Sequence, residues 1–232
     1  MYTGTCVSAA GPGPHQDWLA VHGLLDNAGS WGRLAPLLPP GIRLTCLELP
    51  GHGRSDHLPP GGLYHWLELT LLLERARAAL SLHRPVLLAH SMGAWLAGLY
   101  AALWPHQARA LIQLDGVKPI SRQPAGMVDR VREFFTNLDK LENSPRPDRP
   151  MTEAEAVERV MRGSNALHGK DSLTRDGAGW LAGRGVRQTA AGLVFSRDPR
   201  LLLRDLHGMP HQYNTQFAAS IVCPHLLVPR AL

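Results

Sequence analysis

Short apolar runs alternate with helix-forming segments along the first half of the chain, and this alternation limits the fold to a narrow class. Four runs have the length and composition of buried strands, at residues 18–21, 42–49, 85–89 and 110–114. Helices are predicted between them, at residues 30–38 (with Ser30 as N-cap), 64–82 and 94–104. Strands that alternate with helices pair in parallel and carry helices on both faces. The sequence therefore predicts an α/β fold with a mostly parallel, doubly wound sheet.

The second half of the chain departs from this pattern. Residues 117–212 are rich in arginine and show helical patches without clear strands, and Thr152 with Glu155 has the pattern of a capping box. We expect this segment to be a helical lid placed over the carboxyl ends of the strands. The predicted organisation is a core at residues 1–116, a lid at 117–212 and a return to the core sheet at 213–232.

The positive net charge does not indicate a nucleic-acid partner. The formal charge is +5, from 24 basic and 19 acidic residues. Residues 117–212 hold 16 basic and 12 acidic residues, the rest of the chain holds 8 and 7, and no tight basic run occurs. Basic side chains mixed with acids form a solvated surface more often than a phosphate-binding face.

Cysteine usage and hydropathy favour a protein without a secretory or membrane segment. Cys6, Cys46 and Cys223 are odd in number and widely spaced, so neither a disulfide framework nor a zinc site is expected. No uninterrupted apolar stretch of about 18 residues occurs, and residues 1–16 lack a signal-peptide pattern. We therefore expect no membrane span, no metal or other cofactor, and a cytoplasmic location, with the peroxisome as the alternative.

The sequence AHSMGA at residues 89–94 follows a predicted buried strand and opens a predicted buried helix. A small residue, then x-Ser-x-Gly, is the pattern of a nucleophile elbow. Such a turn raises the Ser91 hydroxyl above the sheet edge and aims the Met92 N–H and the helix N-terminus at a developing oxyanion. The alternative is that Ser91 only caps the helix.

Two further turns follow predicted strands. In HGLLDN, Gly23 permits a close backbone approach, so the Leu24 N–H is a candidate second oxyanion donor, while His22 is expected to shape the turn. An ordinary turn is the alternative. The glycine-rich PGHGRSD turn at residues 50–56 is similar to a phosphate loop but lacks the lysine of that motif, so a P-loop is rejected.

These motifs, in this order and at these separations, resemble the α/β-hydrolase superfamily. The segments VHGLLDNAGSW, LELPGHGRSD, LIQLDG and GLVFSRDPRLL look like those of the serine hydrolase-like protein group. The resemblance implies Ser91 as nucleophile, Leu24 and Met92 as oxyanion donors, and residues 117–212 as the lid that shapes an acyl or alcohol pocket. Serine at the elbow, rather than aspartate, argues against dehalogenase and epoxide hydrolase chemistry.

The chain departs from the superfamily pattern after the lid. In the superfamily, the acid and then the histidine follow the serine along the chain, and the histidine lies after the last strand. This chain ends near the strand that usually precedes the acid, so we expect the last strand, the last helix and the catalytic histidine to be missing. Asp115 ends a strand beside the elbow strand and is the candidate acid. Its alternative role is to hold the hinge of the lid.

The remaining histidines offer no clear base. His90 is next to Ser91, but we expect its side chain to point away from the site. His22 and His52 are expected to shape turns. Four others lie in the lid or beyond it, and we do not expect them at the nucleophile: His168, His207, His211 and His225.

Two functions remain open at this point. The first is a serine hydrolase that cleaves a small apolar carboxylic ester, or a related acyl bond, through a Ser91 acyl-enzyme. The second is a non-catalytic ligand-binding or partner-binding module of the same fold. Missing last strands would leave the predicted strand at residues 226–228 at an exposed sheet edge, which invites self-association.

Overall fold

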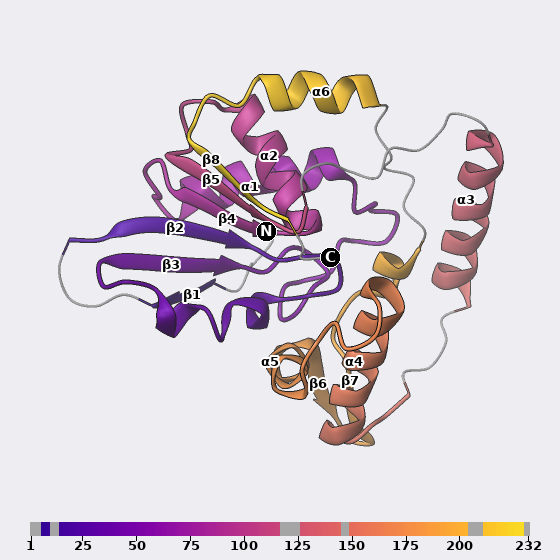
Figure 1. The fold of residues 1–232 in the computed structure, drawn as a ribbon. Helices are drawn as coiled ribbons and strands as arrows, with labels where there is room; N and C mark the ends of the chain where they lie inside the picture. The colour runs from indigo at the N-terminus through magenta and orange to yellow at the C-terminus, as the bar shows by residue number, and fades with distance from the viewer. Residues whose placement is uncertain (1–5, 10–13, 117–125, 145–148, 204–210, 230–232) are drawn as a thin grey trace.

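The computed structural model describes residues 6–9, 14–116, 126–144, 149–203 and 211–229 (Figure 1). Its centre is a six-stranded sheet in the order β1-β3-β2-β4-β5-β8. β1 is antiparallel to β3, and all other neighbours are parallel. The strands are β1 (Cys6–Ala9), β2 (Gln16–Val21), β3 (Ile42–Leu47), β4 (Val86–His90), β5 (Ala110–Leu114) and β8 (His225–Val228). The predicted mostly parallel α/β sheet is confirmed.

Alternating side chains of the central strands pack in two separate apolar clusters, one on each face of the sheet. Leu87 of β4 packs in the larger cluster with α1 (Trp66–Ala79) and α2 (Met92–Leu103), and α6 (His211–Ala219) lies beside α2. Leu88, the next residue, packs in the second cluster with Trp31. Neighbouring residues of a strand point to opposite faces, so the sheet is covered on both sides, as the sequence predicts.

The helix predicted at residues 30–38 is wrong in type and in its cap. The structure has two short 3₁₀ helices there, η1 (Ala28–Trp31) and η2 (Ala35–Leu37). Asn27, rather than Ser30, caps η1, because its Oδ1 accepts the Gly29 N–H at 2.9 Å. Glycines at 29 and 32 and a proline at 36 disfavour a continuous α-helix.

The segment predicted as the lid lies beside the carboxyl ends of the strands (Figure 1). It contains α3 (Met127–Asn143), α4 (Glu153–His168), α5 (Arg175–Gly185), β6 (Val186–Thr189), β7 (Gly192–Phe195) and η3 (Pro199–Leu202). The expectation of no strands here is wrong, since β6 and β7 form an antiparallel hairpin. Each strand has only four residues, too few for a clear alternating pattern.

The predicted capping box at the start of α4 is confirmed. Thr152 Oγ1 accepts the Glu155 N–H at 3.2 Å, and Glu155 Oε2 accepts the Thr152 N–H at 2.7 Å. These reciprocal bonds satisfy two backbone donors that the helix itself leaves unpaired. Local sequence therefore sets the point at which α4 begins.

β8 carries apolar side chains at the edge of the sheet. Leu226, Leu227 and Val228 are 54%, 43% and 43% exposed. In the described part of the chain no strand pairs with the outer side of β8. Self-association through this edge stays a prediction. None of the described helices combines the length and apolar character that a bilayer-spanning helix needs.

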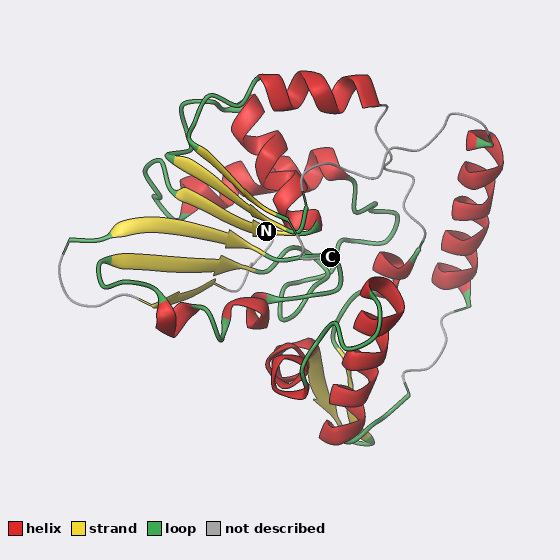
Figure 2. Ribbon diagram, in the orientation of Figure 1, coloured by secondary structure: helices red, strands yellow, loops and turns green. Residues whose placement is uncertain are grey.

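Loops that follow the parallel strands converge at one end of the sheet (Figure 2). The carboxyl ends of β2, β4 and β5 are neighbours there, since Val21 pairs with Ala89 and His90 pairs with Leu114. The turns that carry Gly23, Ser91 and Asp115 come directly after these positions. The topology therefore gathers the predicted site residues at one edge.

Candidate active site

Ser91 occupies a sharp turn between β4 and α2. Its backbone has φ 52° and ψ −120°, a conformation that residues other than glycine rarely adopt. The Ser91 N–H donates to Leu114 O at 3.0 Å, and Ser91 O accepts the Trp95 N–H at 3.2 Å. Holding a residue in such a region costs about 1–3 kcal/mol, which the surrounding packing must offset. This is the geometry that the AHSMGA motif predicts.

Two glycines let the turn at residue 22 approach this elbow. A Cβ built on Gly93 would lie 2.5 Å from the carbonyl oxygens of Val21 and His22. A Cβ on Gly23 would lie 3.2 Å from the Ser91 Cβ. Only hydrogen fits at Gly93, and at Gly23 an added methyl group would press on Ser91. The two turns are therefore in direct contact.

The candidate oxyanion donors are backbone amides on these two turns. Neither the Leu24 N–H nor the Met92 N–H has a hydrogen-bond acceptor among the residues that the structure describes. Met92 is the first residue of α2, where helix geometry leaves the N–H unpaired and the helix dipole is positive. The role of the two amides as oxyanion donors stays a prediction.

His22 stabilises the turn rather than facing a substrate. Its side chain is fully buried. Nδ1–H donates to Gly23 O at 2.8 Å, and Nε2 accepts the Leu49 N–H at 3.1 Å. Burial lowers the pKa of His22, against the opposing effect of its backbone hydrogen bond. The imidazole is neutral and both of its nitrogens are hydrogen-bonded, so it holds the residues that follow β2 and β3 at a fixed separation.

His90 pairs with Asp26 across the two turns. His90 Nδ1 lies 3.4 Å from Asp26 Oδ2, and Ser30 Oγ also donates to this oxygen at 3.3 Å. Burial raises the pKa of Asp26, but the hydrogen bond and charge of His90 outweigh this, so the pKa is lowered overall. His90 makes no hydrogen bond to Ser91 among the described residues, and it lines the cavity described next.

A cavity of about 550 Å³ lies between this sheet edge and the lid segment. Leu24, His90 and Asp115 line its core side, and Trp180 is among its residues on the lid side. Ser91 is half-buried and adjoins this wall through His90 rather than forming part of it. The lining combines apolar side chains with polar and charged ones, among them Asp115, Arg159 and Arg197.

Asp115 lies where the sequence places it, at the end of β5. It has φ 48° and is exposed, and its N–H donates to Val228 O at 2.9 Å. No histidine pairs with its carboxylate among the described residues. Its role as the acid stays a prediction.

Among the described residues, no other histidine hydrogen-bonds Ser91, although His168 lines the cavity. His52 is buried, with Nδ1–H donating to Pro50 O at 2.9 Å, and burial lowers its pKa to about 3. His225 is the first residue of β8, at the end of the sheet opposite to Ser91. Its Nε2 lies 2.7 Å from Gln113 Oε1. His207 and the His211 side chain lie outside the described residues. Within the described part of the chain, no side chain hydrogen-bonds Ser91 Oγ.

Sequence reasoning missed a buried ion pair that joins core and lid segments. Glu48 is fully buried, and its Oε1 accepts Arg184 Nε–H of α5 at 2.7 Å and the Ala28 N–H at 3.1 Å. The Arg54 N–H donates to Oε2 at 2.8 Å. A carboxylate in the run Cys-Leu-Glu-Leu was the available signal, since an isolated acid beside a buried strand needs a partner.

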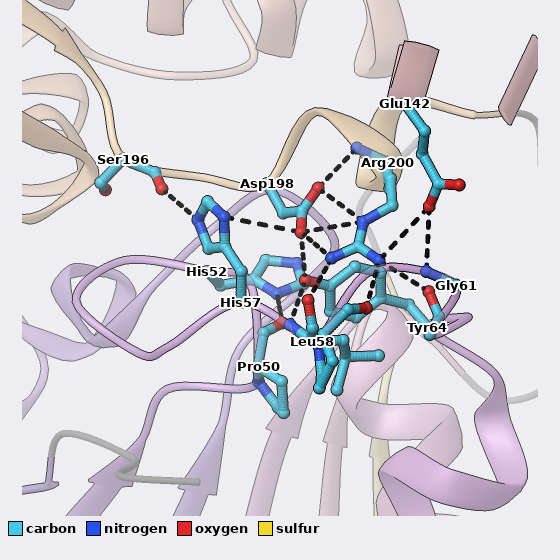
Figure 3. A network of polar contacts seen from close by, with 12 residues as sticks. Pro50, His52, His57, Leu58, Gly61, Tyr64, Glu142, Ser196, Asp198 and Arg200 are labelled. Carbon is cyan, nitrogen blue, oxygen red and sulfur yellow. Dashed lines mark hydrogen bonds and ion pairs between the residues drawn. The ribbon is translucent and has the colours of Figure 1, made fainter. Parts of the chain in front are cut away.

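A second network fastens η3 to the loop that precedes α1 (Figure 3). Tyr64 Oη donates to Asp198 Oδ2 at 2.6 Å, and Arg200 donates to the same oxygen at 2.7 Å. His57 Nε2–H donates to Ser196 O at 2.7 Å. These contacts hold η3 against that loop.

Comparison with known proteins agrees with this geometry. Residues 19–158 match the family described as "alpha/beta hydrolase fold". A serine hydrolase-like protein of Danio rerio is 31% identical over 198 residues, which is 84% of this chain and 59% of the relative. A probable serine hydrolase of Drosophila melanogaster is 31% identical over 214 residues, 90% of this chain and 62% of the relative. The chain thus spans about three fifths of these curated relatives.

Solved structures show the same architecture. A hypothetical protein of Pseudomonas aeruginosa PAO1 superposes with a TM-score of 0.86 at 30% identity, over 97% of this chain and 77% of that one. A thioesterase domain from the curacin biosynthetic pathway gives 0.76 at 26% identity, over 98% and 82%. With the elbow at Ser91, the parallel sheet and the family match in agreement, the chain belongs to the α/β-hydrolase fold family.

Proposed function

We propose that this protein is a serine hydrolase that cleaves a carboxylic ester or a related acyl bond through a Ser91 acyl-enzyme. The observation that carries the proposal is the backbone of Ser91, held at φ 52° and ψ −120° against the turn at Gly23. A conformation this costly supports a nucleophile more than a helix cap, and the Ser91 side chain makes no cap bond.

In the proposed reaction, Ser91 Oγ attacks the acyl carbonyl and its proton passes to a water molecule, because no described side chain hydrogen-bonds the hydroxyl. The carbonyl oxygen becomes an oxyanion that accepts the N–H groups of Leu24 and Met92. Collapse breaks the bond to the alcohol or thiol, which departs with a proton, and water then releases the acid. The relatives named serine hydrolase-like, and the thioesterase domain among the similar structures, support an acyl bond as the target.

We expect turnover to be slow. A serine nucleophile needs a base, and none of the described side chains hydrogen-bonds Ser91 Oγ. Serine hydrolase sites that lack their triad still accelerate the reaction by a factor of about 10³–10⁴ over the rate in water, through the oxyanion hole and substrate binding alone. The same observation favours the second candidate, a ligand-binding or partner-binding module without catalysis.

Labelling with a fluorophosphonate separates these two functions. The wild-type protein is expected to be labelled, and Ser91→Ala is expected to lose the label. Ser81→Ala is the matched control, because Ser81 also has φ 52° but is exposed at the end of α1. If the wild-type protein is not labelled, and if it leaves both ester and thioester substrates intact after long incubation, the function is that of a binding module.

A further inference from the structure

The lid side of the cavity carries an arginine, Arg197, whose guanidinium forms no ion pair among the described residues. Arg197 follows β7, and its Cζ lies 4.0 Å from the centroid of the Phe195 ring. Both residues line the cavity. Arg197 is half-buried, and burial lowers its pKa. Among the described residues, its guanidinium has neither a carboxylate partner nor a hydrogen bond.

Arg200, three residues further on, shows how this fold engages a structural arginine. Its guanidinium donates to both carboxylate oxygens of Asp198 and to the carbonyl oxygens of Leu58, Pro59 and Gly62. The Arg197 guanidinium is held by the face of one aromatic ring. Stacking restricts the plane of a guanidinium while leaving its N–H groups free at the edge.

The other charged side chains that line the cavity form no ion pair with Arg197 among the described residues, and these include the exposed carboxylate of Asp115. Arg33 pairs with Asp176 at 3.3 Å, and Asp26 pairs with His90. Arg159, which also lines the cavity, adds a second positive charge and has no ion pair within the described part of the chain. A half-buried cation without a counter-ion is unfavourable, and a bound anion relieves the cost.

We propose that the ligand of this cavity carries an anionic oxygen group, foremost a carboxylate, that accepts the N–H groups of the Arg197 guanidinium held over the Phe195 ring. Guanidinium and carboxylate match in charge and in the spacing of their donors and acceptors. The apolar remainder of the cavity takes the chain of the ligand. As a statement about substrate this rests on the proposed hydrolase function, whereas binding itself does not require turnover.

Monomethyl adipate and dimethyl adipate form a matched pair of probes, since both carry a methyl ester and only the first carries a carboxylate. Binding is measured by titration calorimetry on full-length Ser91→Ala protein, which excludes turnover. The monoester is expected to bind about tenfold or more tightly than the diester. In Ser91→Ala with Arg197→Gln this preference is expected to vanish. Hexyl phosphate is titrated in the same way, to test whether the anionic group of the ligand is a phosphate rather than a carboxylate.

The control variant is Arg109→Gln, which removes an exposed arginine just before β5, at the amino end of the strand. It is expected to keep the preference. Tighter binding of hexyl phosphate with the same dependence on Arg197 supports the anion site and assigns it to phosphate. Equal affinity for the mono- and diester, or a preference that survives Arg197→Gln, overturns the inference. Fluorophosphonate labelling is scored separately, so failure of hydrolysis and failure of anion binding are distinguishable.

Discussion

The imidazole of His90 lies 3.4 Å from the carboxylate of Asp26, measured from Nδ1 to Oδ2, and this pair ties the elbow to the turn that carries Leu24. The two candidate oxyanion amides belong to these same two turns. The distance between them is therefore set in part by a side-chain contact outside the backbone.

Asp26→Asn weakens this contact without changing the volume of the side chain. We expect the rate of fluorophosphonate labelling at Ser91 to fall about tenfold, because a displaced oxyanion donor stabilises the transition state less. Labelling rates over a series of probe concentrations check this. Asp129→Asn, in an exposed pair with Arg132 on α3, is the control and should label at the wild-type rate. An unchanged rate in Asp26→Asn would mean that the turn is held without His90.

Gly93 permits the contact between α2 and the strand before the turn. Gly93→Ala places a methyl carbon 2.5 Å from the Val21 and His22 carbonyl oxygens, which are backbone and cannot rotate away. We expect the free energy of unfolding to fall by about 3 kcal/mol, measured by urea denaturation. Gly179→Ala in α5 meets no atom within 4 Å and should instead raise it by about 0.5–1 kcal/mol. Equal effects of the two variants would contradict the packing described for the elbow.

Arg184→Met leaves the Glu48 carboxylate buried without its cationic partner. Breaking a buried pair from one side costs about 3–5 kcal/mol, so we expect a loss of about 3 kcal/mol in the free energy of unfolding. Arg175→Met, on the same helix, breaks only the exposed pair with Glu158 and should cost less than about 1 kcal/mol. Thermal and urea denaturation of both variants check the difference. If the two losses are alike, the buried pair does not secure the lid segment to the core.

The buried imidazole of His52 predicts a loss of stability at acid pH. Its pKa is lowered to about 3 in the folded protein, against 6.5 for the free side chain. Between these values the unfolded chain binds a proton that the folded protein does not, so stability falls as the pH falls. The slope from this one group is at most about 1.4 kcal/mol per pH unit.

His52→Asn keeps a donor for Pro50 O and removes the titrating group. We expect a shallower fall in the free energy of unfolding from pH 6.5 to pH 4.5 than in the wild-type protein. His83→Asn, at an exposed position, should follow the wild-type curve. Identical pH dependence in all three proteins would show that another group is responsible.

Local sequence predicted the elements whose signals lie within a few residues. The buried strands could be recognised because each contains an apolar run, at residues 18–21 in β2, 86–89 in β4 and 110–112 in β5. The elbow followed from a motif of six residues, and the start of α4 from the spacing of Thr152 and Glu155. The β6–β7 hairpin and the η1 cap at Asn27 were missed, since both depend on residues that pack against α4 or α5.

The amino-acid sequence by itself determined the parallel strands of the first half and the long helices between them, the family, and the place of Ser91 at a sharp bend, because these depend on periodicity and on short motifs. Only the tertiary structure decided which side chains meet. Glu48 and Arg184 are separated by 136 positions, and Arg197 lines a cavity whose other wall comes from the first part of the chain. Such contacts form when distant segments pack together, and no local pattern encodes which of many charged residues will be brought to the same place.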